Sequence, residues 1–190
     1  MRKLKVEFLQ ACAGPDDLPD RRVPEVALAG RSNVGKSSLL NALSVERKPA
    51  RTSGRPGCTQ TLNIFSVDGG RFHLVDLPGY GYARAPRKVR HRWTEWVERY
   101  LMYRVELRGI ILLVDARHPG MASDVDLSRF LMELGRPYIV ALTKSDKLSK
   151  SKLRSSVDRA QDLGPVLPVS ALKGTGLGEL LRWVDQAVAV

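Results

Sequence analysis

The chain has 190 residues, of which 43% are hydrophobic and 27% are charged. This length and composition suit one globular domain with its own core, and they exclude a mainly disordered or collagen-like chain. The longest apolar run, residues 110–114, is far too short to cross a bilayer. The basic N-terminus carries Glu7 within a short apolar stretch, which favours a strand over a signal peptide. The two cysteines, Cys12 and Cys58, form no spacing motif and predict reduced thiols in a cytoplasmic protein.

The net charge of +11 is concentrated in one part of the chain. Residues 47–108 hold 13 basic and 5 acidic residues, whereas residues 1–46 hold 7 and 6 and residues 109–190 hold 11 and 9. A basic excess of this size predicts an anionic partner such as nucleic acid, an acidic protein or a membrane surface. The alternative is a basic surface that serves only solubility.

Short β-rich segments alternate along the chain with segments of helical spacing. Strands are expected at residues 5–11, 25–29, 61–67, 71–75, 109–114, 137–142 and 165–169. Helices are expected at residues 37–43, 89–100, 123–134, 153–163 and 177–188, the third beginning with a capping box of Ser123 and Asp126. The turn at residues 68–70 predicts a hairpin. Together these elements predict a single α/β domain with three layers and a mostly parallel sheet, to which the hairpin adds one antiparallel edge strand.

A glycine-rich loop carries the strongest chemical signal. It reads Gly30, Arg31, Ser32, Asn33, Val34, Gly35, Lys36 and Ser37, followed by Ser38. This is G-x-x-x-x-G-K-S between an expected strand and an expected helix, the context that a phosphate-binding loop requires. Its backbone N–H groups face the phosphates, Lys36 reaches the β- and γ-phosphates, and the Ser37 hydroxyl binds Mg²⁺. The alternative is a strand–helix turn with a solvated lysine.

Two later segments indicate which nucleotide is bound. Thr143, Lys144, Ser145 and Asp146 end an expected strand, and Val169, Ser170 and Ala171 end the next one. Strand ends of this kind face the ligand crevice of a parallel sheet. The Asp146 carboxylate can accept hydrogen bonds from N1–H and the 2-amino group of guanine, a pair of donors that adenine lacks. Lys144 lies along the base plane, and a backbone N–H near Ser170 binds the guanine O6. A solvated turn is the alternative for each segment.

A further motif follows the hairpin. It consists of Asp76, Leu77, Pro78 and Gly79. Asp76 is expected to hold Mg²⁺ through water, and the Gly79 N–H to contact the γ-phosphate. An ordinary turn is the alternative.

These motifs together resemble a Ras-like P-loop GTPase and, more narrowly, the EngB family of ribosome-biogenesis GTPases. The likeness rests on GRSNVGKS at residues 30–37, PGCTQTLN at residues 56–63 and DLPGYGY at residues 76–82, and it extends over essentially the whole chain. The family belongs to the wider group of TrmE, Era, EngA and septin-like proteins.

The resemblance implies two switch regions, at residues 47–62 and 76–92. In the first, it implies that Thr59 completes the Mg²⁺ shell, with Thr61 and Thr52 as rivals, and that the nucleotide also contacts Gly57, Cys58, Gln60 and Thr61. Cys58 stands where the family usually has a basic residue. The implied catalytic residues are Lys36, Thr59 and Gly79.

The resemblance also implies a biological setting. The partners are GTP and GDP, the large ribosomal subunit and its rRNA, and the family is associated with cell division and septation. A monomer in the cytoplasm is expected.

The sequence lacks the glutamine that orients water in many GTPases, because Tyr80 follows the D-x-P-G motif. We therefore expect slow intrinsic hydrolysis, accelerated by a partner or a cation. Asn33 is a candidate ligand for K⁺, which in relatives replaces the charge of an arginine finger. Alternatively, Asn33 only caps the loop.

The basic stretch offers candidate contacts to RNA phosphates. They are Arg84, Arg87, Lys88, Arg90 and Arg92. The aromatic residues Trp93, Trp96 and Tyr100 recur at helical spacing and are expected in the core.

Three other functions remain open at this point. The chain could be an RNA-binding module that uses GTP only as a structural ligand, a P-loop kinase, or a septum-associated GTPase. The proposed Mg²⁺ ligands argue against the first, and Asp146 argues against the second.

Overall fold

The computed structural model describes residues 2–19, 22–46, 61–79 and 87–189, with the side chains of residues 87–94 left undescribed. Within these residues, seven strands form one sheet: β1 (Val6–Cys12), β2 (Glu25–Gly30), β3 (Leu62–Val67), β4 (Phe72–Asp76), β5 (Leu107–Asp115), β6 (Tyr138–Thr143) and β7 (Val166–Pro168). The α-helices are α1 (Lys36–Leu43), α2 (Arg87–Tyr103), α3 (Ala122–Leu134), α4 (Lys150–Ala160) and α5 (Leu177–Val188). Short 3-10 turns lie at Pro15–Asp17, Ser145–Lys147 and Gln161–Leu163.

The strand order of the sheet is β1-β3-β4-β2-β5-β6-β7. Strands β4, β2, β5, β6 and β7 pair in parallel, and β3 pairs antiparallel with both β1 and β4. The predicted α/β fold, its mostly parallel sheet and the antiparallel pairing at one edge are therefore confirmed. Strand β1 takes the outermost place, outside the β3–β4 hairpin, because it pairs with β3 from Val6↔Val67 to Cys12↔Leu62.

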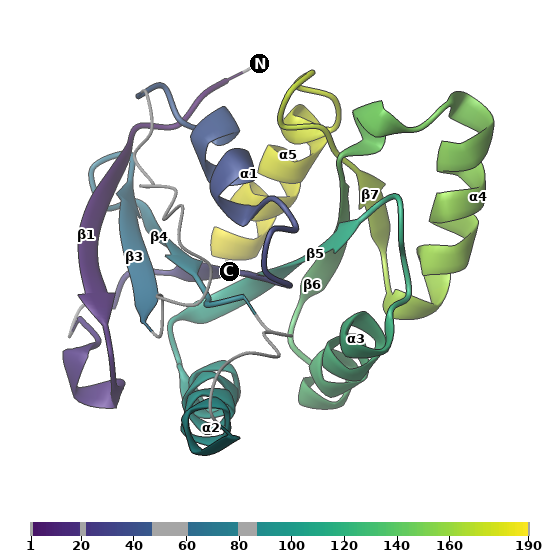
Figure 1. Ribbon diagram of the computed structural model, residues 1–190. Coiled ribbons are helices and arrows are strands. Elements are labelled where there is room, and N and C mark those ends of the chain that lie inside the picture. The colour runs from purple at the N-terminus through teal and green to yellow at the C-terminus, as the bar shows by residue number, and fades with distance from the viewer. Residues whose placement is uncertain (1, 20–21, 47–60, 80–86, 190) are drawn as a thin grey trace.

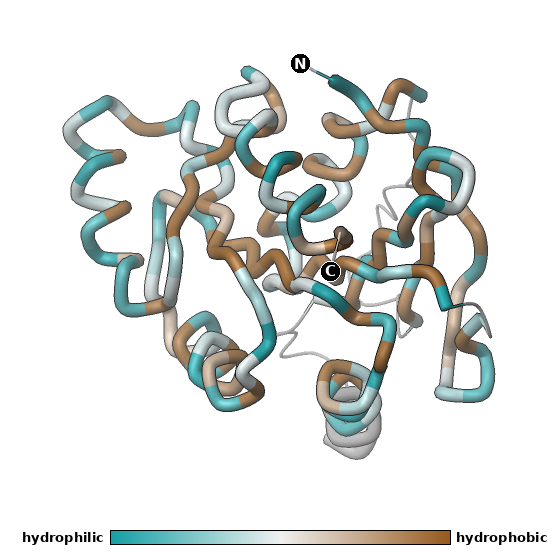
Figure 2. The backbone as a smooth tube through the Cα atoms, turned by 180° about the vertical axis from the view of Figure 1, so that it is seen from behind, coloured by the Kyte–Doolittle hydropathy of each residue, from teal (hydrophilic) through white to brown (hydrophobic). Residues whose placement is uncertain are grey.

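Helices cover both faces of the sheet, so the molecule has three layers (Figure 1). Helices α1 and α5 pack on one face, where Val26 and Leu28 of β2 join their core. Helices α2, α3 and α4 pack on the other, against Ala27 and Ala29 of the same strand. All six residues of β2 are buried, which is expected of a central parallel strand covered on both faces. The hydrophobic centre of the sheet and the more hydrophilic outer helices are visible in Figure 2.

A buried charged group fixes the C-terminal end of α2. The Glu25 carboxylate, fully buried at the start of β2, accepts hydrogen bonds from the Tyr100 hydroxyl (2.8 Å) and from Nη2 of Arg104 (2.8 Å). Burial opposes ionisation of Glu25, but hydrogen bonds from His73, Arg104 and Tyr100 hold its pKa below the ordinary value. Because the ion pair is satisfied on both sides, it joins the helix after the second expected switch to the strand that leads into the glycine-rich loop.

The expected helices and strands are all present, with small differences at their ends. The expected capping box at Ser123 and Asp126 is wrong: Met121 is the N-cap of α3, and no side chain caps this helix end. Tyr100 is buried as expected, and Trp96 is half-buried in edge-to-face contact with it, whereas the Trp93 side chain lies outside the described residues. In the part of the chain that the structure describes, no helix is long and apolar enough to span a membrane.

Candidate nucleotide-binding site

The glycine-rich loop joins β2 to α1 at the carboxyl edge of the parallel strands. Its path requires left-handed backbone at Asn33 (φ 60°) and at Gly35 (φ 116°). The Gly35 conformation is rare for residues with a side chain, which explains the glycine at this motif position. The Thr143 hydroxyl, at the end of β6, donates to the Val34 carbonyl at 2.7 Å and so ties the loop to the sheet. The N-terminus of α1, the end of a helix that favours phosphate groups, therefore lies at this edge of the sheet.

Lys36, in this loop, and Asp76 are half-buried and carry opposite charges that interact electrostatically. Burial lowers the pKa of the Lys36 ammonium, although the Asp76 carboxylate opposes the shift. Burial raises the pKa of Asp76 to about 6, although Lys36 opposes this. One Asp76 oxygen, Oδ1, is buried without a hydrogen-bond partner among the described residues. Such an oxygen lacks the partner that buried polar groups normally have.

This donor set fits a magnesium ion. Mg²⁺ prefers octahedral oxygen ligands and keeps several waters, so one carboxylate, one hydroxyl and the phosphates suffice. Asp76 supplies an unsatisfied buried carboxylate oxygen, and Ser37 lies in the first turn of α1. Within the described residues no cluster of three or more His, Cys, Asp or Glu side chains offers a metal site of another kind.

Gly79 lies directly against the glycine-rich loop. A Cβ at this position would be 2.8 Å from the Ser32 backbone nitrogen and 2.9 Å from the Ser32 Cα. Both contacts are to backbone, so any side chain at residue 79 would push the two segments apart. The preceding Leu77 N–H donates to the Leu28 carbonyl (3.0 Å), which continues the pairing of β4 with β2. The D-x-P-G motif therefore lies against the glycine-rich loop, with Leu77 and Pro78 buried.

The expected base-reading residues also meet at this edge. Asp146 Oδ1 accepts a hydrogen bond from the Ser170 hydroxyl at 2.7 Å, and the Ser145 N–H donates to the Val169 carbonyl at 3.3 Å. Residues 143–146 and 169–171 thus form one unit, although 22 residues separate them. With Ser170 holding one oxygen, the Asp146 carboxylate is oriented before any ligand arrives.

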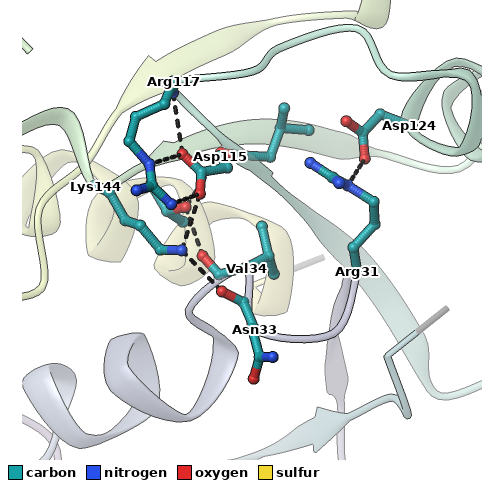
Figure 3. Close-up of polar contacts among 9 residues, drawn as sticks. Arg31, Asn33, Val34, Asp115, Arg117, Asp124 and Lys144 are labelled. Atoms are coloured by element: carbon teal, nitrogen blue, oxygen red, sulfur yellow. Dashed lines mark hydrogen bonds and ion pairs between the residues drawn. The ribbon is translucent and has the colours of Figure 1, made fainter. Parts of the chain in front are cut away.

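Lys144 connects this unit to the glycine-rich loop. Its backbone is left-handed (φ 59°), and its Nζ donates to the Asn33 carbonyl at 2.8 Å and to Asp115 Oδ2 at 2.9 Å (Figure 3). The Asp115 carboxylate also receives a two-pronged contact from Arg117, through Nε (2.9 Å) and Nη2 (2.7 Å). Burial opposes ionisation of Asp115, but Arg117 and Lys144 hold its pKa well below the ordinary value.

Sequence reasoning missed Asp115, Arg117 and Asp124. Asp115 ends β5 at the same edge as the other site residues, and that position is the signal that could have revealed it. Asp124 is fully buried in α3 and pairs with Nε of Arg31 in the glycine-rich loop at 3.0 Å (Figure 3). Arg31, which the sequence places among the nucleotide-binding residues of the loop, therefore joins the loop to α3 through this ion pair.

Several predicted site residues lie outside the described part of the chain. They are Thr52, Gly57, Cys58, Thr59, Gln60, Tyr80 and Arg84. Arg87, Lys88, Arg90 and Arg92 lie within α2, and their side chains are not described. Thr61 is half-buried, with its hydroxyl 3.5 Å from the Asn63 amide oxygen. The predicted roles of Thr59 and of its rivals therefore stay predictions.

Comparisons with known proteins identify the family of this chain. Residues 25–144 match a family model described as "50S ribosome-binding GTPase". The "Probable GTP-binding protein EngB" of Solibacter usitatus is 47% identical over 181 residues, covering 95% of this chain and 94% of the relative. The protein of the same description from Pelotomaculum thermopropionicum is 44% identical over 194 residues, covering 97% and 98%.

Solved structures show the same fold. A crystal structure of "a probable GTP-binding protein engB" superposes with a TM-score of 0.71 at 24% identity, covering 87% of this chain and 98% of that one. Era in complex with MgGDPNP and nucleotides of 16S ribosomal RNA superposes with a TM-score of 0.67 at 28% identity, covering 87% of this chain and 57% of that one. The family model and these relatives show that the chain belongs to the EngB family of GTP-binding P-loop GTPases.

Proposed function

We propose that this chain is a GTP-hydrolysing switch that acts in assembly of the large ribosomal subunit, and that cell division and septation depend on it through ribosome supply. The observation that carries the switch is that the half-buried, opposite charges of Lys36 and Asp76 and the backbone contact of Gly79 with the glycine-rich loop both lie at the expected γ-phosphate position. A motif there can respond to the presence of one phosphate group.

Mg²⁺ is the proposed cofactor. Ser37 and Thr59 would hold it directly and Asp76 through water, and the bound ion would neutralise negative charge on the phosphates. Lys36 supplies a cation to the same phosphates, and the Gly79 N–H orients the γ-phosphate. The remaining predicted contacts at residues 57–61 would close over the nucleotide.

Hydrolysis is proposed to be slow without help, because Tyr80 stands where many GTPases have a water-orienting glutamine. Asn33 is exposed, and its side-chain amide points away from Lys144 and Asp115 (Figure 3), so it is free to bind K⁺. GTP turnover is expected to be faster in K⁺ than in Na⁺, and Asn33→Ala should abolish the difference. Equal turnover in both salts, before and after the substitution, would contradict the role of K⁺.

The ribosomal partner is supported by three observations of different kinds. The matching family model is described as a 50S ribosome-binding GTPase, the structural relative Era is in complex with ribosomal RNA, and the net charge of residues 47–108 is +8. Arginine and lysine residues neutralise RNA phosphates and release counterions. We assign the first contacts to residues 84–92, on a monomer that works in the cytoplasm.

Co-sedimentation with 30S and 50S subunits, under GDP and under a non-hydrolysable GTP analogue, tests this function. We expect 50S binding that depends on the nucleotide, and no subunit preference under either nucleotide would refute the proposal. Arg87→Glu with Arg90→Glu should weaken 50S binding and spare GTP affinity. The matched control, Lys3→Glu with Arg182→Glu, reverses two exposed charges outside residues 47–108 and should have little effect. Absent turnover, with and without subunits, would favour the RNA-binding module instead.

A further inference from the structure

A basic pocket lies between the loop after β5 and helix α4. Its volume is about 330 Å³, and its lining includes Arg117, Lys152 and Arg159 together with the hydroxyls of Ser151 and Ser155. None of the described residues that line it is acidic. We propose that this pocket binds the phosphate backbone of RNA, a partner whose identity rests on the proposed ribosomal function.

The two walls of the pocket are held together in the chain itself. The buried Ser156 hydroxyl, on the inner side of α4, donates to the Ala116 carbonyl at 2.6 Å. This bond fixes the helix against the loop that carries Arg117. An anion therefore meets a site that is already formed, which reduces the entropy lost on binding.

The residues that line the pocket offer more hydrogen-bond donors than acceptors. Lys152 and Arg159 are exposed and make no ion pair with any described residue. Arg117 uses Nε and Nη2 on Asp115, but 44% of its side chain is exposed and its remaining guanidinium N–H groups are available. A guanidinium can thus bridge Asp115 and a phosphate oxygen at the same time. Asp158 is exposed on α4, but it does not line the pocket.

The spacing of the lining residues along α4 favours an extended anion over a single phosphate. Ser151, Ser155 and Arg159 recur every four residues, so they share one face of α4. From Lys152 to Arg159 the helix rises about 10 Å, which is more than one phosphate group can span. Successive phosphates of a polynucleotide can span it. The lining residues include no aromatic side chain for stacking, so the contact is to the backbone and independent of base sequence.

The pocket is also joined to the guanine end of the nucleotide site. Arg117 contacts Asp115, Asp115 contacts Lys144, and Lys144 contacts the loop carbonyl of Asn33 (Figure 3). A phosphate bound to Arg117 therefore lies at one end of a continuous row of charged contacts. For this reason Arg117 is unsuitable as the test residue, because its loss would disturb the nucleotide site itself.

The test replaces the two other cations of the pocket, in the full chain with GDP bound. Lys152→Ala with Arg159→Ala is compared with Lys150→Ala with Arg154→Ala, two exposed cations of the same helix that do not line the pocket. Both pairs lower the net charge equally. The probe is a labelled single-stranded RNA of about 20 nucleotides and mixed sequence, which exceeds the usual site size. Affinity is measured at several salt concentrations.

The pocket pair is expected to weaken RNA binding about 10-fold or more and to reduce the slope of log K against log salt by about 1–2. The control pair should change affinity less than about 3-fold. Equal losses of RNA affinity in both double variants would mean that RNA is attracted by the overall positive charge, and would overturn the proposed binding pocket. No loss of RNA affinity in either variant would overturn it as well. Thermal unfolding of both pairs checks that α4 remains folded.

A second measurement, co-sedimentation with 50S subunits, separates this inference from the proposed function. If the wild-type chain binds no subunit, the ribosomal function fails, while the difference in RNA affinity still decides whether the pocket binds a phosphate backbone. If the pocket pair loses 50S binding but keeps its affinity for free RNA, the pocket contacts a ribosomal protein, and the inference is overturned.

Discussion

At the proposed guanine end of the candidate site, Asp115 is paired with Lys144 and Arg117, and Asp146 with Ser170. At the phosphate end, Asp76 has a buried oxygen without a partner among the described residues. The aspartates at the two ends therefore differ in the direction of their pKa shifts. Arg117 and Lys144 lower the pKa of Asp115, whereas burial raises the pKa of Asp76 to about 6. The proposed guanine end is thus held by contacts within the chain, whereas Asp76 at the proposed phosphate end keeps an oxygen without such a contact among the described residues.

The largest effect is expected from Lys36→Met, which removes the cation of the phosphate end. GTP affinity should fall roughly 30- to 5,000-fold. Removing one partner of a charge pair between a protein and its ligand, here Lys36 and the GTP phosphates, typically costs about 2–5 kcal/mol of binding free energy. Calorimetric titration with GTP measures the change. Lys150→Met, an exposed lysine of α4, is the control and should bind GTP normally. Equal affinity of Lys36→Met and wild type would remove Lys36 from the site.

Asp76→Asn should stabilise the nucleotide-free chain. Between the ordinary pKa of 3.8 and about 6, the folded chain holds a proton that the unfolded chain has released. The free energy of unfolding therefore falls as pH rises through this window, by up to about 3 kcal/mol. The substitution should remove this fall and raise stability at neutral pH, while weakening Mg²⁺-dependent GTP binding.

Urea unfolding across this pH window, without nucleotide or metal, measures the effect. Asp126→Asn, an exposed carboxylate of α3, should leave the pH profile unchanged. A loss of stability for Asp76→Asn at neutral pH would show that burial of the Asp76 carboxylate does not destabilise the folded chain. It would contradict the difference described between the two ends.

Asp115→Asn should weaken binding of the guanine base without changing the contacts to the phosphates. The neutral amide keeps an acceptor oxygen but loses the charge that holds both Lys144 and Arg117. We expect GDP to bind about 10-fold more weakly, within the range for a charged hydrogen bond. Calorimetry with GDP tests this, and Asp158→Asn, an exposed carboxylate on α4, is the matched control. Unchanged affinity would mean that Lys144 is positioned without Asp115.

The smallest effect is expected from Ser170→Ala. The change removes the hydroxyl that holds Asp146 Oδ1 and also accepts from the Lys173 N–H at 3.0 Å. A loss of about 1 kcal/mol corresponds to roughly 5-fold weaker GDP binding. The preference for GDP over inosine diphosphate, which lacks the 2-amino group, should shrink in parallel. Ser123→Ala, whose hydroxyl caps no helix end, should alter neither.

Contiguous motifs made most of this site predictable from sequence. The glycine-rich loop, the D-x-P-G motif and the base-reading segments each place their functional groups within a few residues, and parallel strands bring them to one edge. The contacts between segments could not be predicted in the same way. Asp115 and Asp124 are isolated carboxylates in the sequence, and only the packing of β5 and α3 beside the loop gives them partners.

The ends of elements were the least predictable part of the fold. The helical pattern of α3 is correct, but the polar residues near its start were assigned to capping, whereas Asp124 is turned inward to Arg31. The outer position of β1 was not foreseen either, because hydrophobic alternation identifies a strand but not its neighbour.

That outer position of β1 has a consequence for synthesis. Val6 pairs with Val67, so β1 leaves the ribosome about 60 residues before its partner strand exists. At roughly 5–20 residues per second, this is a wait of about 3–12 s. Meanwhile Phe8 and Leu9 have no sheet to join, and the charged side chains of Lys5 and Glu7 beside them oppose pairing with other nascent chains. Strand β1 is therefore synthesised early but paired late. Until then, the charges of Lys5 and Glu7 oppose its pairing with other nascent chains.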